Sequence, residues 1–455
     1  MMRAIVVACL LALAVTACSR DAGDSYLAGA RAYKARDFHT ALADFRYASA
    51  QGNAEAQNKL GEMYSSGKGV PQNYVEATKW FRLAAHQGNA QGQYNLGLMY
   101  GYGQGVPLDL TKADALFKLS AAQGNAQAQN ILGNSYLDGL GVPKDYAQAI
   151  KYYQLAAKQG LPDAQANLGM MYARGSGVQQ NYIKAAELLR IAAQQGSAGA
   201  QSDLGVMYAR GTGVPQSFAK AVKWYRLAAN QGDASSERLL ANMYAHGLGV
   251  SQDYAEAAKW FRLAAIQGDA IAENDLGTMY ALGHGVPVDY AKAAYWVHLA
   301  AKQGVSVAQS TLGAMYENGA GVRQDYLMAL KWNRLAAQQG NDYAEFNLGD
   351  MYEHGLGVSQ DSTEALRWYR LSAQQGFPPA QNSLSRISTN SEQSVSPNSE
   401  DNTHLREQAS SGDQRTNCGA SYAKILHRMH LVLTNAAGIC KSDESTFTTC
   451  PPCPQ

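Results

Sequence analysis

The sequence predicts an all-α protein, a right-handed α/α solenoid superhelix made of 36-residue helix-turn-helix repeats. Three observations lead to this fold class. A Gln-Gly pair returns ten times at a spacing of 36 residues, from Gln51-Gly52 to Gln375-Gly376. Within each period the motifs Leu-Gly-x-Met-Tyr, Gly-x-Gly-Val and Tyr-x-x-Ala follow one another in the same order. The chain is also 46% apolar and only 16% charged, and fixed periods of this length are typical of stacked units that share one continuous core.

Residues 1–18 predict a lipoprotein-type signal peptide. Arg3 precedes a brief apolar run, and the small residues Val-Thr-Ala stand directly before Cys18. This order is typical of a secretory signal, and the apolar run is too short to cross a bilayer as a helix. Cys18 resembles the lipidated cysteine of bacterial lipoproteins, although Val15 stands where leucine is commoner; an ordinary signal peptide with an incidental cysteine is the alternative. We expect an exported protein anchored by a lipid at Cys18 and facing the periplasm, at the outer membrane because Ser19 follows.

Residues 24–51 predict an N-terminal cap for the array. The segment repeats part of the pattern of the later units, with a shorter loop that lacks Gly-x-Gly-Val. The matching positions are Ala30, Tyr33, Phe38, Ala41, Phe45 and Ala48. Solenoids commonly end in such atypical units.

The first half of each full repeat predicts a helix with one apolar face. In the first copy Ala56 and Leu60 lie at helical spacing, and Asn53 is a suitable N-cap. Gly67 and Gly69 then allow the positive φ angles at which the chain reverses.

The second half of each repeat predicts another helix, which begins near Tyr74 and turns Trp80 and Phe81 inward. All six tryptophans share the column of Trp80, which predicts a place in the core rather than a ligand cage. The residue after the leucine of the first helix is Gly61 or an equivalent glycine in every repeat except at Ala241. A glycine inside a helix costs roughly 1 kcal/mol relative to alanine, so its return predicts close contact between helices.

These units resemble the Sel1-like repeat, a relative of the tetratricopeptide repeat with a longer loop between its helices. The resemblance covers nine copies and a terminal helix within residues 52–388, and the predicted cap resembles a tetratricopeptide unit. It implies a non-catalytic scaffold that binds a protein or peptide of the cell envelope or of a host on the concave face of the array.

An enzyme is the alternative, because some secreted cysteine-rich relatives have been associated with β-lactam binding and hydrolysis. Those relatives carry a cysteine pair in each repeat, whereas residues 19–417 contain no cysteine. No histidine pairs with a nucleophile in a recognisable motif, and the Gly-x-Gly-Val turns join helices rather than follow a strand. We expect no catalytic residue, no cofactor and no metal site.

The chain beyond the array predicts two further segments. Residues 389–417 are rich in Ser, Asn, Glu and Gln and predict a disordered linker. Residues 418–455 predict a small segment whose disulfide candidates are Cys418, Cys440, Cys450 and Cys453, in any of three pairings. A zinc site formed by Cys450, Cys453 and His427 or His430 is the alternative, and a redox role for Cys-Pro-Pro-Cys lacks the usual βαβ context.

The charge of the chain argues against nucleic acid as a partner. Lys and Arg number 38, Asp and Glu 37, and the net charge is +1, so no long-range field attracts a polyanion. A basic column on the second helices, which includes Lys79 and Arg82, predicts either contact with an anionic envelope surface or a solvated outer face. The near-neutral total charge favours the solvated face.

The partner-binding surface is predicted on the first helices. The columns that begin at Glu55, Asn58, Glu62 and Ser66 share one helix face and change freely from repeat to repeat, so packing does not select them. A drifting exposed face is one interpretation and a concave binding surface the other. Tyr, Arg and Phe, which we expect to be exposed here, dominate interface hot spots and favour the binding surface. The predicted contacts are Tyr94, Tyr102, Asn130, Asn134, Asp138, Arg174, Arg210, Arg238, Asn242, His246, Phe346 and His354.

Overall fold

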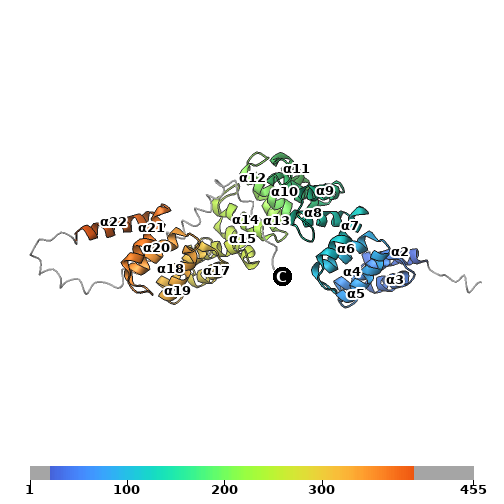
Figure 1. Cartoon of the computed structure of the whole chain (residues 1–455), viewed down its shortest axis with the longest axis horizontal. Helices are drawn as coiled ribbons and strands as arrows, with labels where there is room; N and C mark the ends of the chain where they lie inside the picture. The colour runs from blue at the N-terminus through green and yellow to red at the C-terminus, as the bar shows by residue number, and fades with distance from the viewer. Residues whose placement is uncertain (1–20, 394–455) are drawn as a thin grey trace, which may run out of the picture. The chain divides into compact units, whose positions relative to one another are not determined.

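Helices arranged in consecutive pairs make up the part of the protein that the computed structural model describes, residues 21–393 (Figure 1). This range contains no strand, and it confirms the all-α repeat solenoid; the right-handed sense of the superhelix stays a prediction. None of the helices in residues 21–393 combines the length and the apolar character that crossing a membrane requires.

Two helices precede the repeats, α2 (Ala22–Lys34) and α3 (Phe38–Ala50). The first helices of the nine repeats are α4 (Ala54–Ser66), α6 (Ala90–Tyr102), α8 (Ala126–Asp138), α10 (Pro162–Arg174), α12 (Ala198–Arg210), α14 (Ala234–His246), α16 (Ala270–Leu282), α18 (Ser306–Asn318) and α20 (Asp342–His354). The second helices are α5 (Tyr74–His86), α7 (Leu110–Ala122), α9 (Tyr146–Lys158), α11 (Tyr182–Gln194), α13 (Phe218–Ala229), α15 (Tyr254–Ile266), α17 (Tyr290–Lys302), α19 (Tyr326–Ala337) and α21 (Ser362–Gln374).

A last helix, α22 (Pro378–Gln393), closes the described chain. It continues to Gln393, so the boundary predicted between terminal helix and linker, at 388–389, lies too early. The predicted signal peptide with Cys18, the rest of the linker and the cysteine-containing segment 418–455 lie outside the described residues.

The chain divides into two compact units, one ending at Ser197 and the other beginning at Ala198. We call them the N-terminal unit, with α2 to α11, and the C-terminal unit, with α12 to α22. Within each unit, every helix packs against the next one along the chain.

Side-chain caps and glycines determine where the helices begin and end. The side chain of Asn53 accepts a hydrogen bond from the backbone N–H of Ala56 at 2.8 Å, which confirms the predicted N-cap. At the other end of α4, Gly67 adopts a φ of 68° and its N–H donates to the carbonyl of Met63. Gly69 has a φ of 74°, so both glycines of the loop occupy the left-handed region that other residues disfavour.

Close contact between the two helices of a repeat explains the glycine column. A Cβ atom added to Gly61 would lie 2.4 Å from the ring of Phe81, and one added to Gly133 would lie 2.4 Å from the ring of Tyr153. Ala241, the exception, is fully buried in the core of its own repeat. The tryptophan column also packs inward: Trp332 is buried and the other five are half-buried.

The Gln-Gly pair closes each repeat with a side-chain hydrogen bond that we call a rung. In all nine repeats the glutamine Nε2 donates to a Gln or Glu of the first helix, 30 residues earlier, at 2.7 to 2.9 Å. The first-helix partners are Gln57, Gln93, Gln129, Gln165, Gln201, Glu237, Glu273, Gln309 and Glu345. A rung therefore ties the end of each second helix to its own first helix.

Candidate partner-binding face

The columns that begin at Glu55, Asn58, Glu62 and Ser66 define the first-helix face of each unit. Residues at these positions come from α4 to α10 in the N-terminal unit and from α12 to α20 in the C-terminal unit. We describe the face of each unit separately.

In the N-terminal unit, asparagines of this face accept hydrogen bonds from asparagines of the adjacent column that begins at Lys59, one repeat later. Asn95 Nδ2 donates to Asn58 Oδ1 at 2.9 Å. Asn167 Nδ2 lies 3.1 Å from Asn130 Oδ1 and 3.2 Å from Asn134 Oδ1, and donates to both. The predicted contacts Asn130 and Asn134 therefore already have a structural role between neighbouring first helices.

Three predicted contacts of the N-terminal unit stand at the ends of their helices with accessible side chains. Tyr102, Asp138 and Arg174 are the last residues of α6, α8 and α10, and all three are exposed. Tyr102 has 63% of its surface exposed, although it is a large aromatic residue. These helix ends are the part of this face that a partner can reach without displacing a neighbour.

Tyr94, Arg238 and Phe346 are half-buried, so the prediction that they are exposed is wrong. Tyr94 packs against Phe117, with ring centroids 6.0 Å apart, and burial raises the pKa of its hydroxyl. Packing therefore constrains residues even in the columns whose variation in sequence suggested that packing does not select them.

The same correction applies to Phe346 and Arg238 in the C-terminal unit. Phe346 lies 5.5 Å from both Tyr369 and Phe377, centroid to centroid. Arg238 Nε donates to Asp269 Oδ2 at 2.9 Å, an ion pair between α14 and the N-cap of α16. Arg210, at the end of α12, is exposed.

Three polar atoms without hydrogen-bond partners belong to residues of this face on α14 and α16. Asn242 Oδ1, His246 Nε2 and Asn274 Oδ1 are each buried and have no hydrogen-bond partner among the described residues. Burial lowers the pKa of His246, so its imidazole is neutral at neutral pH and only one of its ring nitrogens carries a proton. Two amide oxygens and an imidazole nitrogen are therefore closed to solvent and have no hydrogen bond from the described part of the chain.

Asp275, beside these atoms, escaped the prediction. It is buried, and burial raises the pKa of its carboxyl to about 7, against the opposing effects of the hydrogen bond from Asn274 and of Arg238. The sequence does contain a signal for it. The column that begins at Lys59 repeatedly holds short polar residues, namely Asn95, Asn167, Asp203, Asp275 and Asn347. Asn95, Asn167 and Asn347 each donate a hydrogen bond to the preceding repeat.

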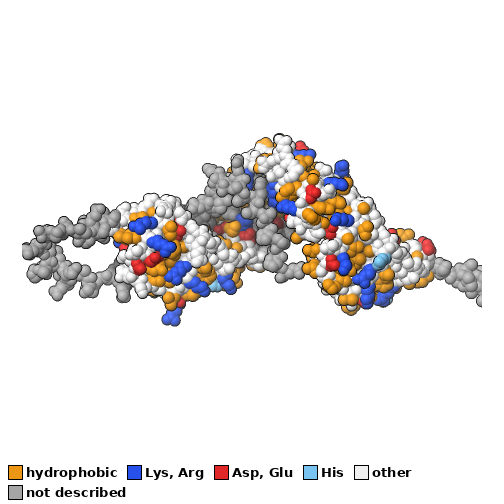
Figure 2. All heavy atoms as spheres, viewed as in Figure 1, with side chains coloured by type: hydrophobic (Ala, Val, Ile, Leu, Met, Phe, Trp, Pro, Cys, Tyr) orange, Lys and Arg blue, Asp and Glu red, His pale blue; other side chains and the backbone are white. Residues whose placement is uncertain are grey.

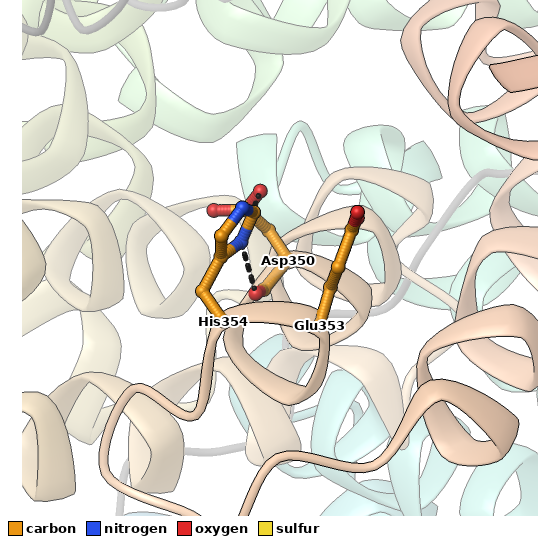
Figure 3. Close-up of side chains that lie close together, drawn as sticks. All are labelled: Asp350, Glu353 and His354. Atoms are coloured by element: carbon orange, nitrogen blue, oxygen red, sulfur yellow. Dashed lines mark hydrogen bonds and ion pairs between the residues drawn. The ribbon is translucent and has the colours of Figure 1, made fainter. Parts of the chain in front are cut away.

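Asp350, Glu353 and His354 lie together at the end of α20 (Figure 3). His354 Nδ1 is 2.9 Å from the carbonyl oxygen of Asp350. Glu353 accepts hydrogen bonds from Tyr369 at 2.7 Å and from Arg386 at 2.8 Å. Although burial opposes them, these two partners hold the pKa of Glu353 below its ordinary value. Because Glu353 is committed to Arg386, the cluster lacks the third available ligand that a protein zinc site requires.

Comparisons with known proteins agree with this architecture. The model of the Sel1 repeat matches nine consecutive segments, 54–89, 90–125, 126–161, 162–197, 198–233, 234–269, 270–305, 306–341 and 342–377. No curated protein matches the chain.

Solved structures with similar folds come from several bacteria. A Sel1 repeat protein from Oxalobacter formigenes is 32% identical over 53% of this chain and 96% of that chain, with a TM-score of 0.51. A protective antigen of uropathogenic Escherichia coli strains, which displays an SLR fold, is 30% identical over 95% of this chain and 97% of that chain, with a TM-score of 0.43. An immunity protein from Pseudomonas aeruginosa is 20% identical over 47% and 81%, with a TM-score of 0.34. Since the repeat model matches most of the sequence, the chain belongs to the Sel1 repeat family.

Proposed function

We propose that this protein is a non-catalytic scaffold of the bacterial cell envelope that binds a protein or peptide on the first-helix face. Sel1 repeats generally mediate interactions between proteins, and no catalytic family matches the chain. The observation that carries the proposal is the set of unpartnered polar atoms on Asn242, His246 and Asn274. A buried polar group without a hydrogen bond costs about 1 to 3 kcal/mol, so its presence needs an explanation.

A peptide that moves the covering side chains aside on binding would supply the missing hydrogen bonds of these buried atoms. The backbone of an extended peptide offers N–H groups at regular intervals, and the oxygens of Asn242 and Asn274 accept such donors. Asp275 lies beside Asn274; with a pKa of about 7 its carboxyl either accepts or donates a hydrogen bond near neutral pH. We therefore assign the partner's main chain to α14 and α16.

Capture of the partner by crosslinking in the membrane fraction tests this assignment. The variant Asn242→Ala/His246→Ala/Asn274→Ala removes the three acceptors, and we expect capture to weaken at least tenfold, about 1.4 kcal/mol. The free energy of unfolding should fall by about 1 kcal/mol, because the variant also removes the hydrogen bond from Asn274 Nδ2 to Asp275, whereas the three acceptor atoms bond to nothing in the described part of the chain.

The matched control replaces Tyr102, Asp138 and Arg174 by alanine in the N-terminal unit. Capture that survives the C-terminal variant and is lost in this control would move the site to the ends of α6, α8 and α10. Loss of capture only after replacement of Lys79, Arg82 and Arg226 would place the site on the second helices. Hydrolysis of a chromogenic β-lactam by the purified protein would overturn the non-catalytic assignment.

The envelope location rests on Cys18, which we propose as the site of a lipid anchor, with Ser19 directing the protein to the outer membrane. Cys18→Ala should block lipoprotein processing and abolish labelling of the protein with fatty acid. Wild-type protein that incorporates no fatty acid and leaves membranes in a salt wash would contradict the anchor.

A further inference from the structure

The two helices of the repeat differ in charge, although the whole chain is nearly neutral. In each of the nine repeats the second helix contains more Lys and Arg than Asp and Glu, and none of the first helices does. The total charge hides this difference because it sums both helices. The largest surplus is on α13, where Lys220, Lys223 and Arg226 stand without a single acidic residue.

Three neighbouring second helices of the C-terminal unit combine these cations with exposed apolar side chains. The cations are Lys220, Lys223, Arg226, Arg262 and Lys302, all exposed; Lys259 and Lys292 are also exposed but pair with Glu256 and Asp289. The apolar residues are Leu227, Leu263, Ile266 and Tyr295, of which Ile266 is 68% and Tyr295 58% exposed. We call this set the basic–apolar patch of α13, α15 and α17. Figure 2 shows blue basic and orange apolar side chains next to one another in several places on the face in view, over both units.

Cations and apolar residues of the patch point the same way. Arg226 and Leu227 lie three and four positions after Lys223, so both neighbour it on one side of α13. With Val250 these residues line a shallow groove beside that helix. Arg226 donates to the hydroxyl of Tyr244 at 2.6 Å. A neutral hydroxyl orients the guanidinium without cancelling its charge, so the groove remains cationic.

We propose that the basic–apolar patch binds the surface of a lipid bilayer that contains anionic phospholipids. Anionic headgroups attract the cations, and the leucine and isoleucine side chains gain free energy when they enter the boundary between headgroups and acyl chains. The phosphates of a nucleic acid would interact favourably with the cations alone, and the apolar side chains would stay in water.

The repetition of the patch favours a bilayer over an acidic protein. The pair Arg226-Leu227 returns 36 residues later as Arg262-Leu263, so α13 and α15 present nearly the same groups, whereas α17 has His298-Leu299 at these positions. Such a repeating surface does not fix one position of a folded partner along the array. A fluid bilayer needs no fixed position in order to bind. This inference is independent of the proposed anchor at Cys18.

Vesicle flotation with the chain from Ser19 onwards tests the proposal, because that chain contains every described residue and carries neither the predicted signal nor an acyl group. Vesicles of phosphatidylcholine alone are compared with vesicles that also contain phosphatidylglycerol. We expect binding only to the phosphatidylglycerol vesicles, and weaker binding as salt increases. The variant Lys220→Gln/Lys223→Gln/Lys302→Gln should lower the partition coefficient about 100-fold, at about 1 kcal/mol for each cation near the surface.

The N-terminal unit supplies a matched control in Lys79→Gln/Lys112→Gln/Lys118→Gln. These lysines pair with Glu76, with Asp109 at the N-cap of α7, and with Asp114, so the same loss of three charges should reduce binding much less. Leu227→Asn/Leu263→Asn/Ile266→Asn should weaken binding as well, while circular dichroism stays unchanged.

If both lysine variants lost vesicle binding equally, the effect would depend on total charge, and the patch would not be the membrane-binding surface. Unchanged vesicle binding by the asparagine variant would exclude insertion into a bilayer and indicate a soluble polyanion instead. Absence of binding to phosphatidylglycerol vesicles would also overturn the proposal. The Asn242→Ala/His246→Ala/Asn274→Ala variant should bind vesicles normally, which separates this inference from the proposed partner site.

Discussion

The N-terminal and C-terminal units use the same rung but different chemistry. All four rungs of the N-terminal unit join two glutamines. In the C-terminal unit three of the five rungs join a glutamine to a glutamate, namely Glu237, Glu273 and Glu345. All three glutamates are buried, and burial raises the pKa of each carboxyl above its ordinary value.

A glutamine on the first helix makes a second bond that an ionised glutamate cannot make. Gln129 accepts the rung hydrogen bond from Gln159 with its oxygen and donates its Nε2 to the carbonyl of Ala121, 3.1 Å away on the preceding second helix. Gln57, Gln93 and Gln165 do the same at 3.4 to 3.5 Å. A carboxylate has no hydrogen to donate. An ionised glutamate in a rung therefore cannot make the hydrogen bond to the carbonyl oxygen of the preceding second helix.

The first-helix face shows the same contrast. The asparagines of the N-terminal unit satisfy one another, as Asn95 does with Asn58, whereas Asn242 and Asn274 of the C-terminal unit keep unpartnered oxygens. The comparison indicates that the N-terminal unit is built for its own stability. The C-terminal unit carries polar atoms that the described residues leave without hydrogen bonds, and the proposed partner site would use them.

Overpacking the N-terminal unit should have the largest effect. In Gly133→Val the new side chain meets the ring of Tyr153, which lies 2.4 Å from the added Cβ, and we expect a loss of about 3 kcal/mol. Hydrogen exchange in urea should show the loss in residues 21–197 and little change from Ala198 onward.

A control for this substitution is Gly199→Ala, where nothing lies within 4 Å of the added Cβ. We expect it to stabilise the C-terminal unit by about 1 kcal/mol. If Gly133→Val reduced protection equally in both units, they would form one cooperative body and the comparison between them would not hold.

Exchanging the rungs should have an intermediate effect that depends on pH. At about pH 7, Glu237→Gln/Glu273→Gln/Glu345→Gln should stabilise the C-terminal unit by about 2 kcal/mol, because buried charges disappear and three donors are restored. The folded-state pKa of each glutamate is raised, so the wild type has its full stability below the unfolded pKa and loses stability as the pH rises through the folded pKa. The gain from the variant should therefore shrink towards about pH 4 in urea unfolding.

The reverse exchange in the N-terminal unit, Gln93→Glu/Gln129→Glu/Gln165→Glu, should introduce the same pH dependence there. A triple glutamine variant whose advantage is equal at both pH values would show that ionisation of the glutamates does not cause the difference.

Truncating single asparagines should give the smallest effects and should separate the two faces. Asn95→Ala breaks a buried hydrogen bond to Asn58 and should cost about 1 kcal/mol in urea unfolding. Asn242→Ala removes an oxygen with no partner in the described chain and should change stability by less than about 0.5 kcal/mol. Equal losses from both would indicate that Asn242 has a structural role in the fold.

The sequence alone determined the period, the helix pairs, the caps and the glycine column. These features depend on contacts within one turn of helix or on residues that return from copy to copy. The sequence therefore shows each feature many times, which makes it recognisable without the structure. Asn53 was identified as an N-cap from its position, and Gly61 as a point of close contact from its recurrence. The same comparison located the candidate binding face on the first helices, as the columns that do not repeat.

Tertiary structure decided which residues of that face are used within the array. Asn167 reaches Asn130 across 37 residues, Arg238 reaches Asp269 across 31, and the rungs span 30. Each of these contacts depends on the stagger and spacing of packed helices, which the pattern of a single repeat does not contain. Tyr94 and Phe346 looked variable because each copy fills the space beside its own neighbour differently, so a column can vary in sequence and still be fixed by packing.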